Sequence, residues 1–236
     1  DLLPGRVGEP ELFAILGAGY ARQRVFLSEI ASVGALLESD FSARDRVIHL
    51  ANSSAEPMRF PLMNATNLSE ALSATAEAMN SGEDLALLFL TSHGHTDVFS
   101  TQFAGISYKD VSAPQLADMI DASGIENLIV VVSACYSGSF IDDLAADDRL
   151  IITAAGADRK SFGCSDHSEW TWFGEAFFDI ALRRTKDFRF AFEDAVKTVA
   201  AWETAAGYAP SNPQIQQGSE IAKVIDCWLE ARLAQR

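Results

Sequence analysis

The sequence has few cysteines, few basic residues and no long apolar run, and each shortage excludes a class of protein. Its three cysteines, Cys135, Cys164 and Cys227, are too few for the disulfide framework of a small secreted protein. The 18 Lys and Arg residues face 33 Asp and Glu residues, and the resulting net charge of −15 disfavours nucleic acid and anionic membranes as principal partners. The longest apolar runs, residues 85–90 and 128–132, are far shorter than the ~20 residues that cross a bilayer.

Motifs for nucleotide binding and for serine hydrolases are missing as well. The sequence contains no phosphate loop, no dinucleotide fingerprint and no Gly-x-Ser-x-Gly turn, and we expect no cofactor. It begins at Asp1 without an initiator Met or a signal-peptide pattern, which suggests that a segment upstream has been removed.

What is present is the composition of a globular protein, with 48% hydrophobic and 22% charged residues, and an alternation of strands and helices. Apolar, β-rich runs predict buried parallel strands at residues 12–16, 47–50, 85–91, 128–133 and 150–154. Amphipathic periodicity predicts helices at residues 25–37, at 68–79 after a cap at Asn67, at 112–124 with a cap at Ser112, and at 172–180, 192–202 and 221–229. The alternation predicts an α/β fold, a mostly parallel sheet with helices on both faces. No linker divides the chain, so we expect one domain over residues 1–236, with roughly the first ten residues as a linker.

Two of the predicted strands end in residues that can carry out chemistry. One run ends in Ser92-His93-Gly94-His95, and the other ends in Ser133-Ala134-Cys135-Tyr136-Ser137-Gly138. Ligands of open α/β sheets bind beyond the carboxyl ends of the strands, and an imidazole beside a thiol can generate the reactive thiolate. Gly94 leaves room for a substrate carbonyl and could present its N–H to an oxyanion. We therefore consider Cys135 and His93 as a nucleophile and base.

Plainer roles for the same residues remain open at this point. A cysteine after an apolar strand is often a small buried side chain, and a lone histidine is often structural. A metal site formed by His93, His95 and a cysteine is disfavoured, because alternate residues of an extended segment point to opposite faces and no second ligand cluster is present. We expect no metal.

These residues resemble the legumain (asparaginyl endopeptidase) family of caspase-like cysteine peptidases. The family shows Asp-His-Gly and then Glu-Ala-Cys-x-Ser-Gly-Ser at a similar separation, and here Ser92-His93-Gly94 precedes Cys135 by 42 residues. Gln23-Arg24 stands where the family carries a Tyr-Arg pair, and the likeness extends from about residue 12 to about residue 178.

The resemblance implies a fold, an activity and a set of site residues. The fold is a caspase-like three-layer sandwich, and the activity is cysteine endopeptidase cleavage through a thioester, with a peptide or protein as the substrate. Cys135 is the implied nucleophile, His93 the base, and the N–H groups of Gly94 and Cys135 the oxyanion hole. The implied specificity pocket contains Arg24, Ser161 and Asp166, and this combination suits Asn or Asp at the cleaved bond.

Two departures from the family pattern bear on these expectations. Ser133 replaces the family's pocket glutamate, which puts strict preference for Asn in question, and residues 17–20 offer no counterpart of the asparagine that orients the histidine. Two alternatives stay open: a peptide ligase or transamidase of the same fold, and a catalytically silent caspase-like module that binds other proteins. The sequence leaves the oligomeric state open and leans slightly toward an exported or membrane-tethered domain.

Overall fold

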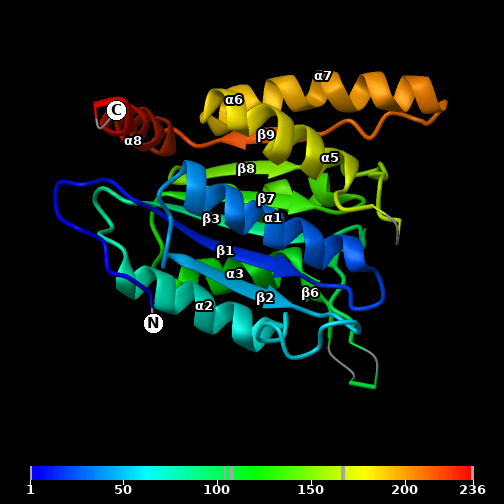
Figure 1. Cartoon of the computed structure of the whole chain (residues 1–236), viewed down its shortest axis with the longest axis horizontal. Helices are drawn as coiled ribbons and strands as arrows, with labels where there is room; N and C mark the ends of the chain where they lie inside the picture. The colour runs from blue at the N-terminus through cyan, green and yellow to red at the C-terminus, as the bar shows by residue number, and fades with distance from the viewer. Residues whose placement is uncertain (1, 104, 107–108, 166–167, 235–236) are drawn as a thin grey trace.

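The computed structural model of the chain describes residues 2–103, 105–106, 109–165 and 168–234, and a six-stranded sheet lies at its centre (Figure 1). The strand order is β2-β1-β3-β7-β8-β9, and every neighbouring pair is parallel except β8 and β9. The strands of this sheet are β1 (Leu12–Ala18), β2 (Val47–Ala51), β3 (Leu85–Thr91), β7 (Leu128–Ser133), β8 (Arg149–Thr153) and β9 (Gln214–Gln217). A small antiparallel sheet is formed by β4 (Gly94–His95), β5 (Val98–Phe99) and β6 (Val111–Ser112).

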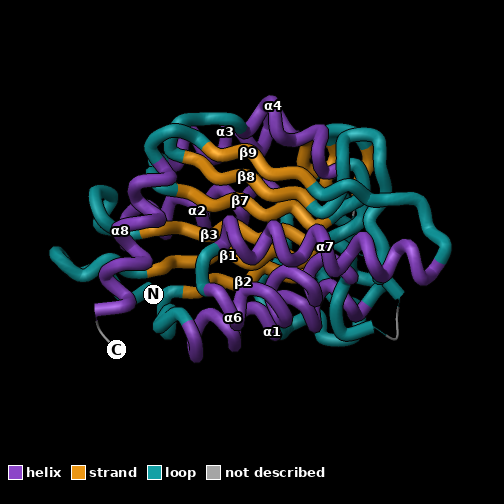
Figure 2. The backbone as a smooth tube through the Cα atoms, turned by 90° about the horizontal axis from the view of Figure 1, so that it is seen from above, coloured by secondary structure: helices purple, strands orange, loops and turns teal. Residues whose placement is uncertain are grey.

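Helices cover both faces of the large sheet and make three layers (Figure 2). On one face lie α1 (Arg24–Asp40), α5 (Trp172–Gly174), the π-helix η2 (Glu175–Leu182), α6 (Arg183–Thr185), α7 (Phe188–Ala206) and α8 (Ile221–Ala234). On the other face lie α2 (Ala65–Ala78), α3 (Ala113–Ser123), the 3-10 helix η1 (Ser137–Phe140) and α4 (Ile141–Leu144). The chain therefore folds as a mostly parallel α/β sandwich.

The two helix layers divide the apolar core according to the alternation of the strands. In β3, Leu87 and Phe89 pack with α1, η2 and α7, whereas Leu88 and Leu90 pack with α2 and α3. A strand covered on both faces must be apolar at every position, which is why β3 and β7 appear in the sequence as uninterrupted apolar runs.

The five strands predicted from apolar runs are confirmed, as are the helices, with small changes at their ends. Ser112 caps α3, and Gly124 ends it with a positive φ of 73°. The predicted cap of α2 was wrong, because Asn64 rather than Asn67 accepts the capping hydrogen bond. The sequence missed β9, an edge strand whose polar residues carry no apolar signal.

The register of the central strands determines which residues meet beyond the sheet. Thr91 pairs with Ser133 at the carboxyl ends of β3 and β7, so His93 and Cys135 each follow two residues after a matched pair. No helix in the described part of the chain is both long and apolar enough to cross a membrane.

Candidate active site

Cys135 lies on a sharp turn between β7 and η1. The next residue, Tyr136, has a φ of 61°, and its N–H donates to the carbonyl of Arg159 at 2.7 Å. Gly138 passes so close to the following loop that a Cβ there would lie 2.6 Å from the backbone nitrogen of Ala157. This tight turn directs the chain away from the sheet and leaves the Cys135 side chain half-buried at its edge.

His93 follows β3, and its neighbour Gly94 brings the two strand ends into contact. A Cβ on Gly94 would lie 2.6 Å from the carbonyl oxygen of Cys135 and 3.0 Å from the Cβ of Ala134. Real Cβ atoms do not approach backbone oxygens this closely, so the contact requires glycine. The structure thus brings the backbones of Gly94 and Cys135 together, and the joint action of His93 and Cys135 stays a prediction.

The imidazole of His93 is clamped by three side chains from the segment after β1. Its ring meets Tyr20 and Phe26 edge to face, with ring centroids 4.6 and 5.4 Å away. Its Nε2 hydrogen-bonds the Oε1 of Gln23, the residue that precedes α1. The amide NH2 of Gln23 donates in turn to the carbonyl of Cys164 at 2.8 Å. His93 is therefore held by two aromatic rings and by a hydrogen bond at one nitrogen.

This clamp also fixes where the proton of the neutral imidazole resides. Because the NH2 of Gln23 is occupied by a carbonyl, its Oε1 must face His93, and a carbonyl oxygen can only accept. Nε2 of His93 therefore carries the hydrogen, and Nδ1 keeps a free lone pair. Burial, with a smaller contribution from His95, lowers the pKa of His93 below its ordinary value, so the imidazole is a neutral potential base at neutral pH.

The Cys135 thiol contacts the loop that follows β8. Its Sγ lies 3.6 Å from the carbonyl oxygen of Ser161 and 3.8 Å from the Ser161 Oγ. Among the described residues no hydrogen bond joins Cys135 to His93, which is a common arrangement before substrate binds. No described residue accepts a hydrogen bond from the backbone N–H of Cys135, so that group is available to a ligand.

Ser133 belongs to a buried hydrogen-bonded network behind the thiol. It is 2% exposed, and its hydroxyl lies 3.3 Å from the hydroxyl of Thr171. Thr171 donates to the fully buried carboxyl of Glu29 from its hydroxyl at 2.7 Å and from its N–H at 3.0 Å, and the Thr91 hydroxyl donates to the same carboxyl at 2.5 Å. Burial raises the pKa of Glu29, although these hydrogen bonds act in the opposite direction.

Arg24, another predicted pocket residue, has no hydrogen bond or ion pair with the described residues of this centre. Arg24 is exposed at the first turn of α1, where it lines a shallow depression with Leu27 and Arg59. No hydrogen bond or ion pair in the described part of the chain joins Arg24 to Ser133 or Ser161, and its pocket role stays a prediction. Asp166 lies outside the described residues.

All three cysteines are free thiols. Cys227 is exposed on α8, whereas Cys164 is half-buried, and burial raises the pKa of the Cys164 thiol. Within residues 2–103, 105–106, 109–165 and 168–234, no group of three or more His, Cys, Asp and Glu side chains could hold a metal ion.

Two features of the site are not predicted from the sequence. The resemblance gives Gln23 a place beside Arg24 but no role, and nothing in its sequence neighbours indicates that it reaches His93. Glu29 carried a usable signal, because it stands four residues from Val25 and four from Val33 on the apolar stripe of a helix. A carboxyl at such a position needs buried donors, and Thr91 and Thr171 provide them.

The fold is caspase-like, and comparisons with known proteins agree with this class. The model of the peptidase C13 family matches residues 62–219, so the chain belongs to this family, the family of legumain. Among solved structures, caspase-1 from Spodoptera frugiperda is similar, with 14% identity, a TM-score of 0.60, and 90% of this chain and 88% of that chain covered. A search of curated proteins gave no match.

Proposed function

We propose that this chain is a cysteine endopeptidase in which Cys135 is the nucleophile and His93 is the general base. The observation that carries the proposal is the approach of Gly94 to the Cys135 carbonyl, which sets the two strand ends side by side. The fixed tautomer of His93 adds support, because it leaves Nδ1 free to accept a proton.

The proposed reaction runs through a thioester. Rotation about the Cα–Cβ bond moves the thiol from Ser161 toward His93, and Nδ1 takes the proton from Sγ. The sulfur attacks the scissile carbonyl carbon, and the oxyanion accepts from the N–H groups of Gly94 and Cys135. The C–N bond then breaks as the imidazolium protonates the leaving amine. Water, deprotonated by His93, attacks the thioester and releases the carboxylic acid product and the thiol.

Specificity in this proposal comes from Arg24, Ser133, Ser161 and Asp166, with Asn or Asp at the cleaved bond. The contact of Ser161 with the Cys135 sulfur supports its place beside the substrate. Ser133 has no carboxylate, and its buried hydroxyl is engaged with Thr171. Ser133 therefore gives the substrate no anionic acceptor. A side chain that needs only a cationic partner, such as Asp, should therefore be accepted as readily as Asn.

A peptide-library cleavage assay on the wild type, Cys135→Ala and Cys227→Ala tests the proposal. Wild type and Cys227→Ala should cleave alike, since Cys227 lies on α8, while Cys135→Ala should lose all activity above background. Iodoacetamide should alkylate Cys135 faster than Cys164, whose pKa is raised by burial. Cleavage by Cys135→Ala would contradict the mechanism, and cleavage after Lys or Arg would contradict the role of Arg24. Adding an amine nucleophile to the assay separates hydrolysis from ligation.

A further inference from the structure

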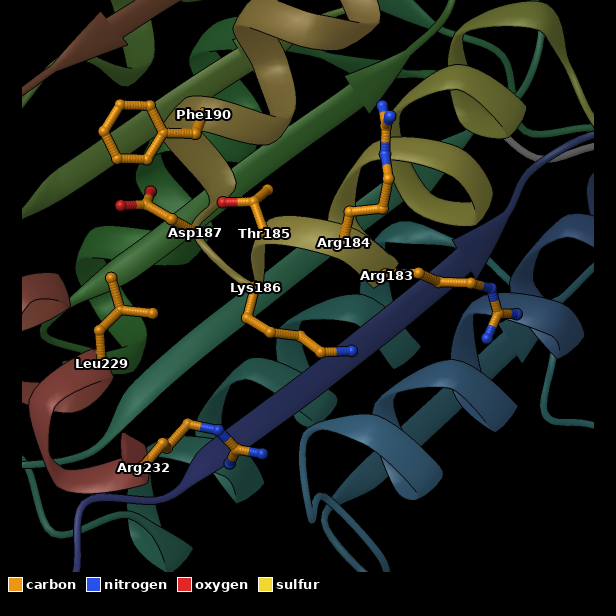
Figure 3. A pocket seen from close by; sticks show the side chains of 8 residues that line it. All are labelled: Arg183, Arg184, Thr185, Lys186, Asp187, Phe190, Leu229 and Arg232. Carbon is orange, nitrogen blue, oxygen red and sulfur yellow. The ribbon is translucent and has the colours of Figure 1, made fainter. Parts of the chain in front are cut away.

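A second pocket, of about 420 Å³, lies far from the candidate active site (Figure 3). It is lined by α6, the two residues after it, the start of α7, and α8, through Arg183, Arg184, Thr185, Lys186, Asp187, Phe190, Leu229 and Arg232. Helix α1 connects the two places: Gln23 before its start bonds His93, and Asp40 at its end bonds Lys186. At 1.5 Å per residue, the 17 residues of α1 separate them by roughly 25 Å.

The lining of this pocket is basic in a strongly acidic protein. Four of the 18 Lys and Arg residues line it, against a single carboxylate, that of Asp187. Asp187 is 4% exposed and is already engaged by Arg189, whose backbone N–H and guanidinium donate to it at 2.7 to 3.2 Å. The lining side chains therefore carry more positive than negative charge, although Asp40, Asp179 and Asp194 around the pocket pair with three of the cations.

Two of the four cations are fixed in place by the end of α1. Arg232 donates to the carbonyls of Phe41 at 2.7 Å and Asp40 at 2.9 Å, and its guanidinium lies over the rings of Trp228 and Phe41. Lys186 pairs with Asp40 and also lies over the Phe41 ring. Through these contacts, Lys186 and Arg232 support the end of α1. The same contacts hold both side chains at the pocket, so a ligand loses little free energy in ordering them.

The other two cations have looser structural roles. Arg183 pairs with Asp179 one helical turn earlier, at 2.9 Å, and is 43% exposed. Arg184 is 63% exposed, and its carboxylate partner Asp194 is 3.6 Å away, beyond good hydrogen-bond length. An exposed pair of this kind contributes little to stability, so the fold gives no reason for Arg184 to be cationic.

An apolar wall stands opposite the cations. Phe190, in the first turn of α7, is 59% exposed, and Leu229 of α8 lies on the same side of the pocket, with Asp187 between them in Figure 3. In Figure 3 the amino group of Lys186 lies between the guanidinium groups of Arg183 and Arg232, while Phe190 and Leu229 lie on the other side. Exposed phenylalanine costs solvation free energy, and a ligand that covers it recovers that energy.

We propose that this pocket binds a small organic anion, a carboxylate or phosphate monoester carried on an apolar body. Arg183 and Lys186 hold the anionic group, and the apolar body packs against Phe190 and Leu229. The volume is within the range of small-molecule sites, about 300 to 1,000 Å³, and suits a ligand with a single ring.

Calorimetric titration of the full chain carrying Cys135→Ala, which removes peptidase chemistry, tests this site with phenyl phosphate, inorganic phosphate and phenol as probes. Phenyl phosphate should bind one to one and more tightly than either of the other probes. Arg183→Gln should weaken its binding about tenfold, the usual loss of one charge-assisted hydrogen bond. Phe190→Ser should reduce phenyl phosphate to the affinity of inorganic phosphate, and the matched control Lys109→Gln, exposed and outside the pocket, should change nothing.

Three results would overturn the proposal. The first is the absence of saturable phenyl phosphate binding, and the second is equal binding by the wild-type pocket and by an Arg183→Gln/Arg184→Gln double variant. The third is equal affinity for phenol and phenyl phosphate, which would mean that charge is not recognised. Both arginines are well exposed, so circular dichroism should show unchanged folding in every variant.

Discussion

The two strand ends that form the candidate active site are held in different ways. On the β3 side, His93 is fixed directly by Gln23, Tyr20 and Phe26. On the β7 side, the hydrogen-bond partner of the Cys135 thiol among the described residues is Ser161, at 3.6 to 3.8 Å. Cys135 is instead positioned by the backbone contacts of its turn and by the buried hydrogen-bonded network of Ser133. The base is thus oriented by its side-chain partners, whereas the nucleophile is positioned by its backbone.

This difference fits the chemistry that each group performs. An imidazole must present one particular nitrogen, so its ring orientation and tautomer need to be set before substrate arrives. A thiol has one rotatable bond and a polarisable sulfur, and it must move from the general base to the substrate carbon during the reaction. Gly94 is a point at which both sides meet, because its backbone lies against the Cys135 carbonyl.

Separating the two strand ends at Gly94 should have the largest effect on activity. Gly94→Ala places a Cβ 2.6 Å from the Cys135 carbonyl oxygen, so the strand ends must separate. A displacement of about 1 Å between reacting groups can cost a hundredfold, and we expect kcat/KM to fall by at least about that factor. Gly82→Ala is the matched control, since a Cβ there meets nothing within 4 Å. Full activity in Gly94→Ala would mean that the two strand ends do not act together.

Much of this arrangement follows from the sequence because it depends on local patterns. Buried parallel strands such as β3 and β7 are apolar at every position, and the residues after them lie at one edge of the sheet. That reasoning alone places His93 near Cys135. The turn at Cys135 is also encoded locally, by Gly138 two residues after Tyr136.

The supports of the site were not predictable in the same way, because they join segments far apart in the chain. The Gln23–His93 bond spans 70 residues and the Glu29–Thr171 bonds span 142. No periodicity or turn signal specifies such pairs, and only the packing of α1 against the sheet creates them. The apolar position of Glu29 indicated a buried carboxyl, but not its partners.

Removing the hydrogen bond between Gln23 and His93 should have the next largest effect on activity. In Gln23→Ala, His93 loses its fixed tautomer and orientation, and we expect kcat to fall about 10- to 100-fold while KM changes little. Gln216→Ala, at an exposed position of β9, is the matched control and should behave as wild type. A structural role for Gln23 alone would instead lower the thermal midpoint and leave kcat intact.

The pH profile gives a sharper measure of the same contact. Because burial lowers the pKa of His93, wild-type activity should persist below the pH at which an ordinary histidine becomes protonated. Gln23→Glu keeps an acceptor oxygen but adds a negative charge, which stabilises the imidazolium and raises the pKa of His93. The acid limb of kcat/KM should therefore move to higher pH in Gln23→Glu. An unchanged limb would show that Gln23 does not contact the base in solution.

On the β7 side, Glu29→Gln should have the smallest effect, and it should appear in stability. Burial raises the folded-state pKa of Glu29 above the unfolded value, so the folded chain binds the proton more tightly. This stabilisation is complete below the unfolded pKa and is lost as the pH rises through the folded pKa.

The free energy of unfolding contributed by Glu29 should therefore decline with rising pH, by at most about 1.4 kcal/mol per pH unit. Gln cannot ionise, so Glu29→Gln should remove this decline. When urea midpoints are measured between pH 4.5 and 8, the midpoint of Glu29→Gln should approach or exceed that of the wild type toward pH 8. Glu38→Gln, at an exposed position of the same helix, should run parallel to the wild type. If Glu29→Gln also runs parallel, the carboxyl behind Ser133 is not the proton-binding group, and the two sides of the site are less different than their contacts indicate.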